Sequence, residues 1–258
     1  MKKSLLVILV ASIVLLTLAA QCFRAESAES FDPDRDEALT AWFPFDGDLA
    51  DKTGKFGSGK VIGDKIEKET ADGTVEFVEG VSGQAVYLDG TKGIQLPDDL
   101  IKDYDYTVSF WMKWEGDITP FTPVFFGAYD PNSWISIPPY HSAVAGGSFL
   151  LWSFSDYWYD GILNVSFKPG TWYHVAAVVN NGRARVYVNG KYVLSKIQIN
   201  GVEDMTGKVP DVFRKKPGGI FTVGVNWWDP AFKGVVDDLR IYDRPLSKSE
   251  IEVLYGKR

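Results

Sequence analysis

The sequence predicts an all-β protein, a sandwich or barrel of short antiparallel strands. Through most of the chain, short segments rich in Val, Ile, Phe, Tyr and Trp alternate with Gly, Asp, Asn and Pro, a pattern typical of such folds. The Asn-Gly dipeptides at 181–182 and 189–190 favour the positive-φ turns of tight hairpins. No long stretch has helical periodicity before the last dozen residues. These observations argue against an α/β fold.

The expected strands are the β-branched and aromatic segments that lie between turn signals. They cover residues 41–45, 83–89, 93–97, 106–114, 172–179, 183–189, 192–194, 220–225 and 235–242. The segment 106–114 (YTVSFWMKW) is apolar on both faces, which predicts a central strand. Near the end, Ser247 and Glu250 have the spacing of a capping box, which predicts the start of a short helix.

The first residues predict a secretory signal at 1–20. Lys2 and Lys3 precede an apolar run that ends in small residues, as signal peptides do. The run is slightly short for a spanning helix, and an uncleaved N-terminal anchor stays open as an alternative. Cys22, the only cysteine, stands where a lipoprotein carries its acyl chain, although Gln21 departs from the usual small residue before it. We therefore expect a secreted, periplasmic or cell-envelope protein, with lipidation at Cys22 also open.

Residues 21–38 are charged and small, so they are expected to form a flexible acidic tether. Residues 39–258 then form one domain, a normal length for a single all-β sandwich. Because Cys22 is the only cysteine, no disulfide can stabilise it.

The net charge limits the classes of partner. It is −7 for the whole chain, and loss of the two lysines of the signal makes it about −9. An acidic surface argues against nucleic acid and against anionic membranes. It suits a neutral or cationic ligand, and membrane contact is expected only through an N-terminal anchor or lipid.

Several segments, in this order, resemble a known family. They are WFPFDG at 42–47, GVSGQA at 80–85, LDG at 88–90, YTVSFW at 106–111, WYHVA at 172–176, VYVNG at 186–190, VDDLRIY at 236–242 and PLS at 245–247. Together they resemble the laminin-G-like jelly-roll domain of the concanavalin-A-like lectin/glucanase superfamily. The resemblance implies a two-sheet antiparallel jelly-roll sandwich with a short C-terminal helix, in which the first and last strands lie side by side. It also implies work on carbohydrates, often as a module beside an enzyme.

The region 115–170 is longer than the family pattern and unusually aromatic. Sugar rings have apolar faces that pack on aromatic rings, and their hydroxyls bind nearby carboxylates and amides. The expected carbohydrate-binding residues are Trp134, Tyr140, His141, Trp152, Tyr157, Trp158, Tyr159, Trp227, Trp228 and Asp229.

The aromatic residues of this region differ in how firmly they indicate a ligand. Adjacent aromatics at 157–159 and 227–228, read as turns, cannot all point inward, so ligand contact is favoured over loop packing or a protein interface. Phe149, Trp152 and Phe154 are expected on one face of a strand, with core and ligand roles both open. Trp42, Phe110, Trp172 and Phe221 are assigned to the core. His174 is expected to be a structural histidine, and His141 has either a sugar contact or no role.

Four aspartates suggest a structural calcium ion. Asp46 and Asp48 follow the first strand, and Asp237 and Asp238 lie in the last one, so neighbouring strands would bring their carboxylates together. Alternation would place Asp237 on the inner face with Val235 and Leu239, where a carboxylate needs a partner. The family resemblance also implies calcium near this place. The alternative is that Asp238 pairs with Arg240 and that Asp46 and Asp48 bind turn amides.

Catalytic patterns of the superfamily are missing from the sequence. There is no Glu-x-Asp-x-x-Glu run for glycoside hydrolysis, and no basic cluster to neutralise a uronate in a lyase. The sequence therefore favours a secreted, non-catalytic module that binds a neutral polysaccharide or oligosaccharide. A structural or interaction protein of the cell envelope is the alternative, and an enzyme is the least favoured class.

Overall fold

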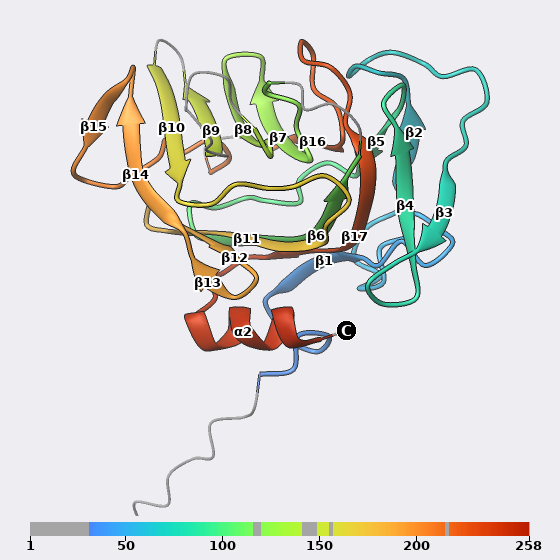
Figure 1. The fold of residues 1–258 in the computed structure, drawn as a ribbon, viewed down its shortest axis with the longest axis horizontal. Helices are drawn as coiled ribbons and strands as arrows, with labels where there is room; N and C mark the ends of the chain where they lie inside the picture. Colours follow the sequence, from blue (N-terminus) through green and yellow to red (C-terminus); the bar gives the residue numbers. More distant parts are fainter. Residues whose placement is uncertain (1–30, 116–119, 141–148, 155–156, 215–216, 258) are drawn as a thin grey trace, which may run out of the picture. The chain divides into compact units, whose positions relative to one another are not determined.

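Two antiparallel sheets lie face to face, and helix α2 (Lys248–Gly256) packs outside one of them (Figure 1). The computed structural model describes residues 31–115, 120–140, 149–154, 157–214 and 217–257, with backbone alone for 149–154. Residues from Pro33 onward form one compact unit. The predicted all-β sandwich with a short C-terminal helix is thus confirmed.

The first sheet contains the first and last strands of the chain, side by side. Its order is β13 (Lys191–Tyr192), β12 (Arg183–Val188), β11 (Tyr173–Asn180), β6 (Tyr106–Trp114), β17 (Lys233–Tyr242), β4 (Gln84–Asp89) and β3 (Glu76–Glu79), with β1 (Leu39–Phe43) also paired to β17. The predicted pairing of first and last strands is present, with Trp42 opposite Arg240. Strand β6 has the bounds expected from its apolar run and is buried along almost its whole length.

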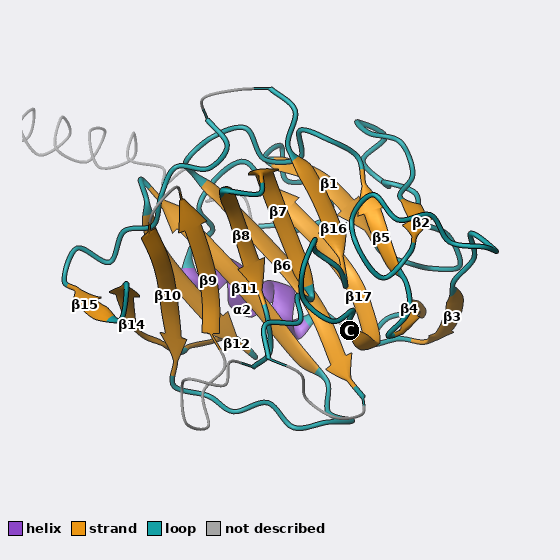
Figure 2. Cartoon of the chain, turned by 90° about the horizontal axis from the view of Figure 1, so that it is seen from above, coloured by secondary structure: helices purple, strands orange, loops and turns teal. Residues whose placement is uncertain are grey.

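The second sheet is built largely from the region that departs from the family pattern. Its order is β15 (Val202–Asp204), β14 (Leu194–Ile199), β10 (Tyr157–Leu163), β9 (Phe149–Phe154), β8 (Ser133–Ile137), β7 (Phe125–Asp130), β16 (Ile220–Val223), β5 (Gly93–Leu96) and β2 (Lys60–Ile62). Figure 2 shows β10, β9, β8 and β7 side by side in the middle of this sheet. The long aromatic insertion therefore forms four neighbouring strands, of which only β9 was expected.

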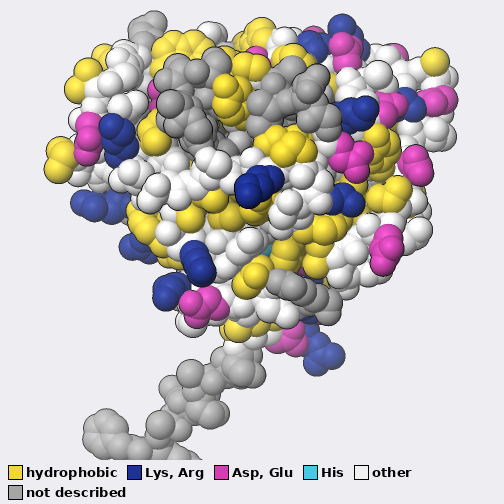
Figure 3. Space-filling view, viewed as in Figure 1, with side chains coloured by type: hydrophobic (Ala, Val, Ile, Leu, Met, Phe, Trp, Pro, Cys, Tyr) yellow, Lys and Arg dark blue, Asp and Glu magenta, His cyan; other side chains and the backbone are white. Residues whose placement is uncertain are grey.

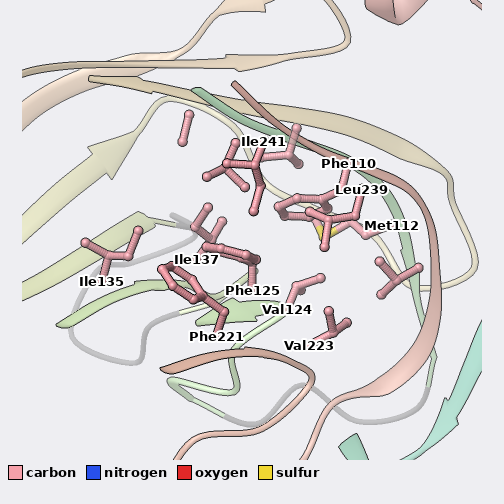
Figure 4. Close-up of a cluster of buried hydrophobic side chains, with 14 of the residues drawn as sticks. Phe110, Met112, Val124, Phe125, Ile135, Ile137, Phe221, Val223, Leu239 and Ile241 are labelled. Atoms are coloured by element: carbon pink, nitrogen blue, oxygen red, sulfur yellow. The ribbon is translucent and has the colours of Figure 1, made fainter. Parts of the chain in front are cut away.

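The main core fills the space between the sheets. Alternate residues of each strand point inward, so Phe110 and Leu239 of the first sheet meet Phe125 and Phe221 of the second (Figure 4). Phe110 and Phe221 were expected in the core and are fully buried. Trp42 and Trp172 were expected there as well, but both are only partly buried. Their rings lie beneath cations instead, Arg240 over Trp42 and Lys113 over Trp172.

The helix begins where the sequence places it. The Ser247 hydroxyl accepts a hydrogen bond from the Glu250 amide at 3.3 Å, and the Glu250 carboxylate accepts one from the Ser247 amide at 2.6 Å. Both bonds of a capping box are present. Ile251 and Leu254 bury the inner side of the helix.

The segment just before the first strand is held against the domain. Arg240 donates to the Pro33 carbonyl and to Asp34, and Arg244 binds Asp36 at 2.6 Å. The expectation of a flexible tether over 21–38 is therefore wrong for its last residues. Their acidic side chains and one carbonyl bind Arg240 of β17 and Arg244 just after it. The signal predicted at 1–20 and the predicted lipidation site Cys22 lie outside the described residues. Within the described ranges, no helix is both long and apolar enough to span a bilayer.

Candidate functional site

A second apolar cluster lies on the outer face of the second sheet, away from the main core. Its buried members include residues of β7, β8 and β10, and Trp227 of the loop 226–230 packs against them. Two rings of this cluster, Phe126 and Trp134, contact three further tryptophan rings. We call the five rings together the aromatic face: Phe126, Trp134, Trp158, Trp227 and Trp228. Figure 3 shows hydrophobic side chains gathered along the top of the molecule, where the second sheet lies in the same view of Figure 1.

Strand alternation places these rings together. Phe125 points into the main core, so Phe126 points outward, where its ring centroid lies 5.8 Å from that of Trp134. Trp134 lies 5.8 Å from Trp158 and 5.7 Å from Trp228. Four tryptophans that the sequence singled out, spread over nearly a hundred residues, thus form one contiguous surface.

The aromatic face has a buried floor and open edges. Trp134 is 5% exposed, whereas Trp158 is 54% and Trp228 is 49% exposed. Large aromatic side chains that are about half exposed and surround one buried ring form an apolar patch. Such patches commonly mark binding sites. Flat, exposed rings can stack against the apolar face of a ligand.

The loop that carries Trp227 and Trp228 is fixed by one buried amide. The Asn226 carboxamide oxygen accepts from the amides of Trp228 at 2.9 Å and Asp229 at 2.8 Å, and its nitrogen donates to the Asp229 carboxylate at 2.6 Å. Burial raises the pKa of the Asp229 carboxyl, although its bond with Asn226 opposes the shift. Asp229 therefore positions the loop, and the sugar contact expected of it stays a prediction.

The cluster Tyr157-Trp158-Tyr159 lies in strand β10, and not in the turn that we expected. Successive side chains of a strand point to opposite faces. Tyr159 packs against the main core, while Trp158 joins the aromatic face. Tyr157 is 52% exposed and shares the parity of Tyr159. The three rings are thus divided between two faces, and only Trp158 belongs to the aromatic face.

The remaining expected residues lie at the border of this surface or outside the described part. The carbonyl of Tyr140 accepts from the amide of Phe121, whose ring packs against the second cluster. His141 and the side chain of Trp152 lie outside the described residues. The register sets Phe149 opposite Ile162 and Trp152 opposite Tyr159. Which face the side chains of Phe149, Trp152 and Phe154 occupy stays a prediction.

One polar residue of this face was missed by the sequence reasoning. Asp160 follows Trp158 by two residues and so shares its face, where the register pairs it with Gln198 of β14. It is half-buried, and this burial raises the pKa of its carboxyl. Asp160-Gly161 resembles a turn, and this concealed the strand that places the carboxylate beside Trp158.

The four aspartates expected to bind calcium divide into two pairs. Asp46 and Asp237 both reach the turn 80–84: Asp46 accepts from the Gln84 amide at 2.7 Å, and Asp237 from the amides of Val81 and Ser82 at 2.7 and 3.2 Å. A side chain on Gly80 would come within 2.6 Å of the Asp237 carboxylate. The turn therefore needs glycine where that carboxylate approaches.

The other pair does not join them. Asp48 is exposed and binds Lys52 at 3.2 Å. Asp238 binds Arg240 at 3.0 Å and the Trp42 indole at 2.6 Å. In the part of the chain that the structure describes, no three acidic, histidine or cysteine residues gather as a metal site. The expectation of a four-aspartate cluster is thus wrong for Asp48 and Asp238.

A bulge in β17 explains the separation. The register shifts between Asp237 and Arg240, and Asp238 has a φ of 48°. Val236 and Leu239 therefore both point into the main core, and Asp237 lies on the other face of the sheet, beneath the turn 80–84. The sequence analysis assumed strict alternation and so expected Asp237 on the same face as Leu239. That expectation is wrong because of the bulge. Asp237 is 1% exposed, and burial raises the pKa of its carboxyl to about 7.

The chain is similar to known carbohydrate-related proteins. The family model of the concanavalin A-like lectin/glucanases superfamily matches residues 88–252. Domain 4 of AbnA, a GH43 extracellular arabinanase from Geobacillus stearothermophilus, solved in complex with arabinotriose, is 40% identical with a TM-score of 0.73. That similarity covers 84% of this chain and 98% of the domain.

A more distant structure shares the fold alone. The binding domain of Paraclostridial Mosquitocidal Protein 1 is 19% identical with a TM-score of 0.50, over 84% of this chain and 52% of that one. No curated protein sequence matches this chain at a significant level.

Proposed function

Because this chain belongs to the concanavalin A-like lectin/glucanase superfamily, we propose that it is a non-catalytic carbohydrate-binding module that holds neutral, arabinose-containing oligosaccharides on its aromatic face. The observation that carries the proposal is the convergence of Trp134, Trp158 and Trp228, with the last two about half exposed. The solved domain that is 40% identical was crystallised with arabinotriose, which supplies the sugar class.

The chemistry of the surface fits a neutral sugar. The C–H face of a sugar ring can lie on the exposed rings of Trp158 and Trp228, and its hydroxyls can reach polar groups beside them. Asp160 and Asp229 place carboxylates near these rings, and the chain has a net charge of −7. Both features repel a uronate-rich chain. Asp229 is held by Asn226, an arrangement that serves loop geometry more directly than acid–base chemistry.

Replacing either exposed tryptophan tests the site. We expect Trp158→Ala and Trp228→Ala each to weaken arabinotriose binding at least ten-fold, since truncation of a central aromatic anchor commonly costs about 2 kcal/mol. Tryptophan fluorescence titration measures this. Tyr192→Ala, equally exposed on the first sheet, is the matched control and should bind as the wild type does.

Two results would count against the proposal. One is an emission spectrum that arabinotriose leaves unchanged, which would favour the envelope or interaction protein. The other is release of reducing ends from arabinan by the purified protein, which would make it an enzyme.

We also propose that the mature domain works outside the cytoplasm. The proposal rests on the basic start and apolar run of residues 1–20. Intact-mass measurement of the protein from its native membrane or culture medium separates the three alternatives: cleavage near residue 20, an acyl chain on Cys22, or a retained N-terminal anchor.

A structural calcium ion beside the turn 80–84 is the third proposal. Asp46 and Asp237 would hold it there with carbonyls of the turn. One oxygen of the buried Asp237 carboxylate has no hydrogen-bond partner among the described residues, as a metal ligand would require. Calcium would neutralise the carboxylates and tie β1, β4 and β17 together.

Chelation tests the calcium site. We expect EDTA to lower the melting temperature and added calcium to restore it, because an ion that binds only the folded state stabilises it. The variant Asp237→Asn should lose this response, and Asp48→Asn should keep it. Identical melting curves with and without chelator would contradict the site.

A further inference from the structure

Asp160 and Gln198 form a polar pair on the same face as Trp158. The two residues lie directly opposite each other on β10 and β14, so their Cβ atoms are about 5 Å apart. Trp158 precedes Asp160 by two residues, which places the carboxylate about 7 Å along the strand from the exposed indole. This spacing is close to the width of one sugar ring.

Asp160 has no partner in the described part of the chain. Neither a hydrogen bond nor an ion pair reaches its carboxylate, although it is half-buried, and desolvation is the cause of its raised pKa. The buried carboxylate of Asp51 differs in this respect. Asp51 accepts from the amides of Trp42, Lys55 and Phe56.

An unpaired carboxylate that is partly removed from water destabilises a fold. Such a group is retained where a ligand supplies its partners, and binding sites commonly give up stability in this way. Its place beside an open aromatic ring is where the hydroxyl rim of a stacked sugar would lie.

We propose that Asp160, assisted by Gln198, is the residue pair that recognises the hydroxyl groups of the sugar stacked on Trp158. The inference rests on the proposed function and deepens it. A carboxylate accepts two hydrogen bonds from neighbouring hydroxyls of a neutral sugar, and a carboxamide both donates and accepts. The same carboxylate repels an acidic sugar, so the pair selects neutral residues over uronates.

Isothermal titration with arabinotriose, and in parallel with trigalacturonate, tests the pair. We expect Asp160→Asn to weaken arabinotriose binding about ten-fold, because a hydrogen bond to a charged group is lost. Gln198→Ala should weaken it less. Asp160→Asn should also narrow the preference for arabinotriose over trigalacturonate. Asp243→Asn, which removes an exposed carboxylate beyond the end of β17, is the matched control and should change neither affinity.

A second measurement separates recognition from a structural role. The melting temperature of ligand-free Asp160→Asn should equal or exceed that of the wild type, since the change removes an unpaired charge from a half-buried position. A lower melting temperature together with weaker binding would overturn the inference in favour of a structural role.

The remaining outcomes distinguish this inference from the proposed function. If the wild type binds arabinotriose and Trp158→Ala does not, but Asp160→Asn binds as the wild type does, only the role of Asp160 is overturned. If the wild type binds neither oligosaccharide, the proposed function is overturned and the inference with it.

Discussion

Replacing Arg240 with methionine is expected to lower the free energy of unfolding by about 3–5 kcal/mol, the usual cost of removing one partner from a buried ion pair. Arg240 is 1% exposed. Its guanidinium donates to Asp238 at 3.0 Å and to Asp34 at 2.6 Å, and lies 4.2 Å from the centre of the Trp42 ring. Methionine fills part of the volume but leaves both carboxylates without their cation.

Urea denaturation at neutral pH measures this effect. Arg185→Met, an exposed position on β12, is the control and should change stability by less than about 0.5 kcal/mol. The double variant Arg240→Met/Asp238→Asn should recover part of the loss, because one stranded charge is gone. If Arg240→Met lowers the free energy of unfolding by less than about 1 kcal/mol, the buried ion pairs of Arg240 do not contribute the stability expected of them.

Acid is expected to destabilise the domain through His174 by about 1.4 kcal/mol per pH unit below the pKa of a free histidine. The side chain is 2% exposed, with Nε2 2.8 Å from the Ser109 hydroxyl. Burial, assisted by the positive charge of Arg240, lowers the pKa of His174 to about 3. The folded form therefore stays neutral while the unfolded chain takes up a proton.

The sign follows from that difference. The stabilisation is fully present above about pH 6.5, the unfolded pKa, and is lost progressively as the pH falls toward 3. His174→Gln, which can keep a bond to Ser109, should remove this slope between pH 6.5 and 4.5. Comparing each variant with the wild type cancels the titration of Asp237, whose raised pKa acts in the opposite direction.

Urea midpoints measured at half-unit steps of pH provide the test. His141→Gln, which changes the only other histidine of the chain, is the control. Equal pH slopes for His174→Gln and the wild type would mean that His174 takes up a proton as readily in the folded domain as in the unfolded chain.

Most of the sandwich could be predicted because its signals are local. The dipeptides Asn181-Gly182 and Asn189-Gly190 adopt positive φ angles, as tight hairpin turns require. The capping box and the apolar strand β6 also depend on neighbours in sequence. The docking of Pro33 and Asp34 could not be predicted, because their partner Arg240 is about two hundred residues away in the sequence. The segment itself is charged and has no local pattern that indicates a partner.

The site could be predicted only in part. Adjacent tryptophans indicated exposed rings, because a strand or turn cannot bury both neighbours on one side. Their convergence depends on the placement of β7, β8 and β10 in one sheet and on the loop 226–230, which no local pattern specifies. Asp160-Gly161 was misleading, because it has the composition of a turn but occupies the middle of a strand.

The salt bridge between Asp34 and Lys257 brings the two ends of the folded unit together. Both ends lie by helix α2, on the first-sheet side of the sandwich, whereas the aromatic face is on the outer side of the second sheet (Figure 1). A polypeptide that continues from either end therefore starts on the side of the sandwich opposite the aromatic face. Because its two ends are close together and far from the aromatic face, the domain can be inserted between other domains or repeated in tandem without blocking the proposed sugar site.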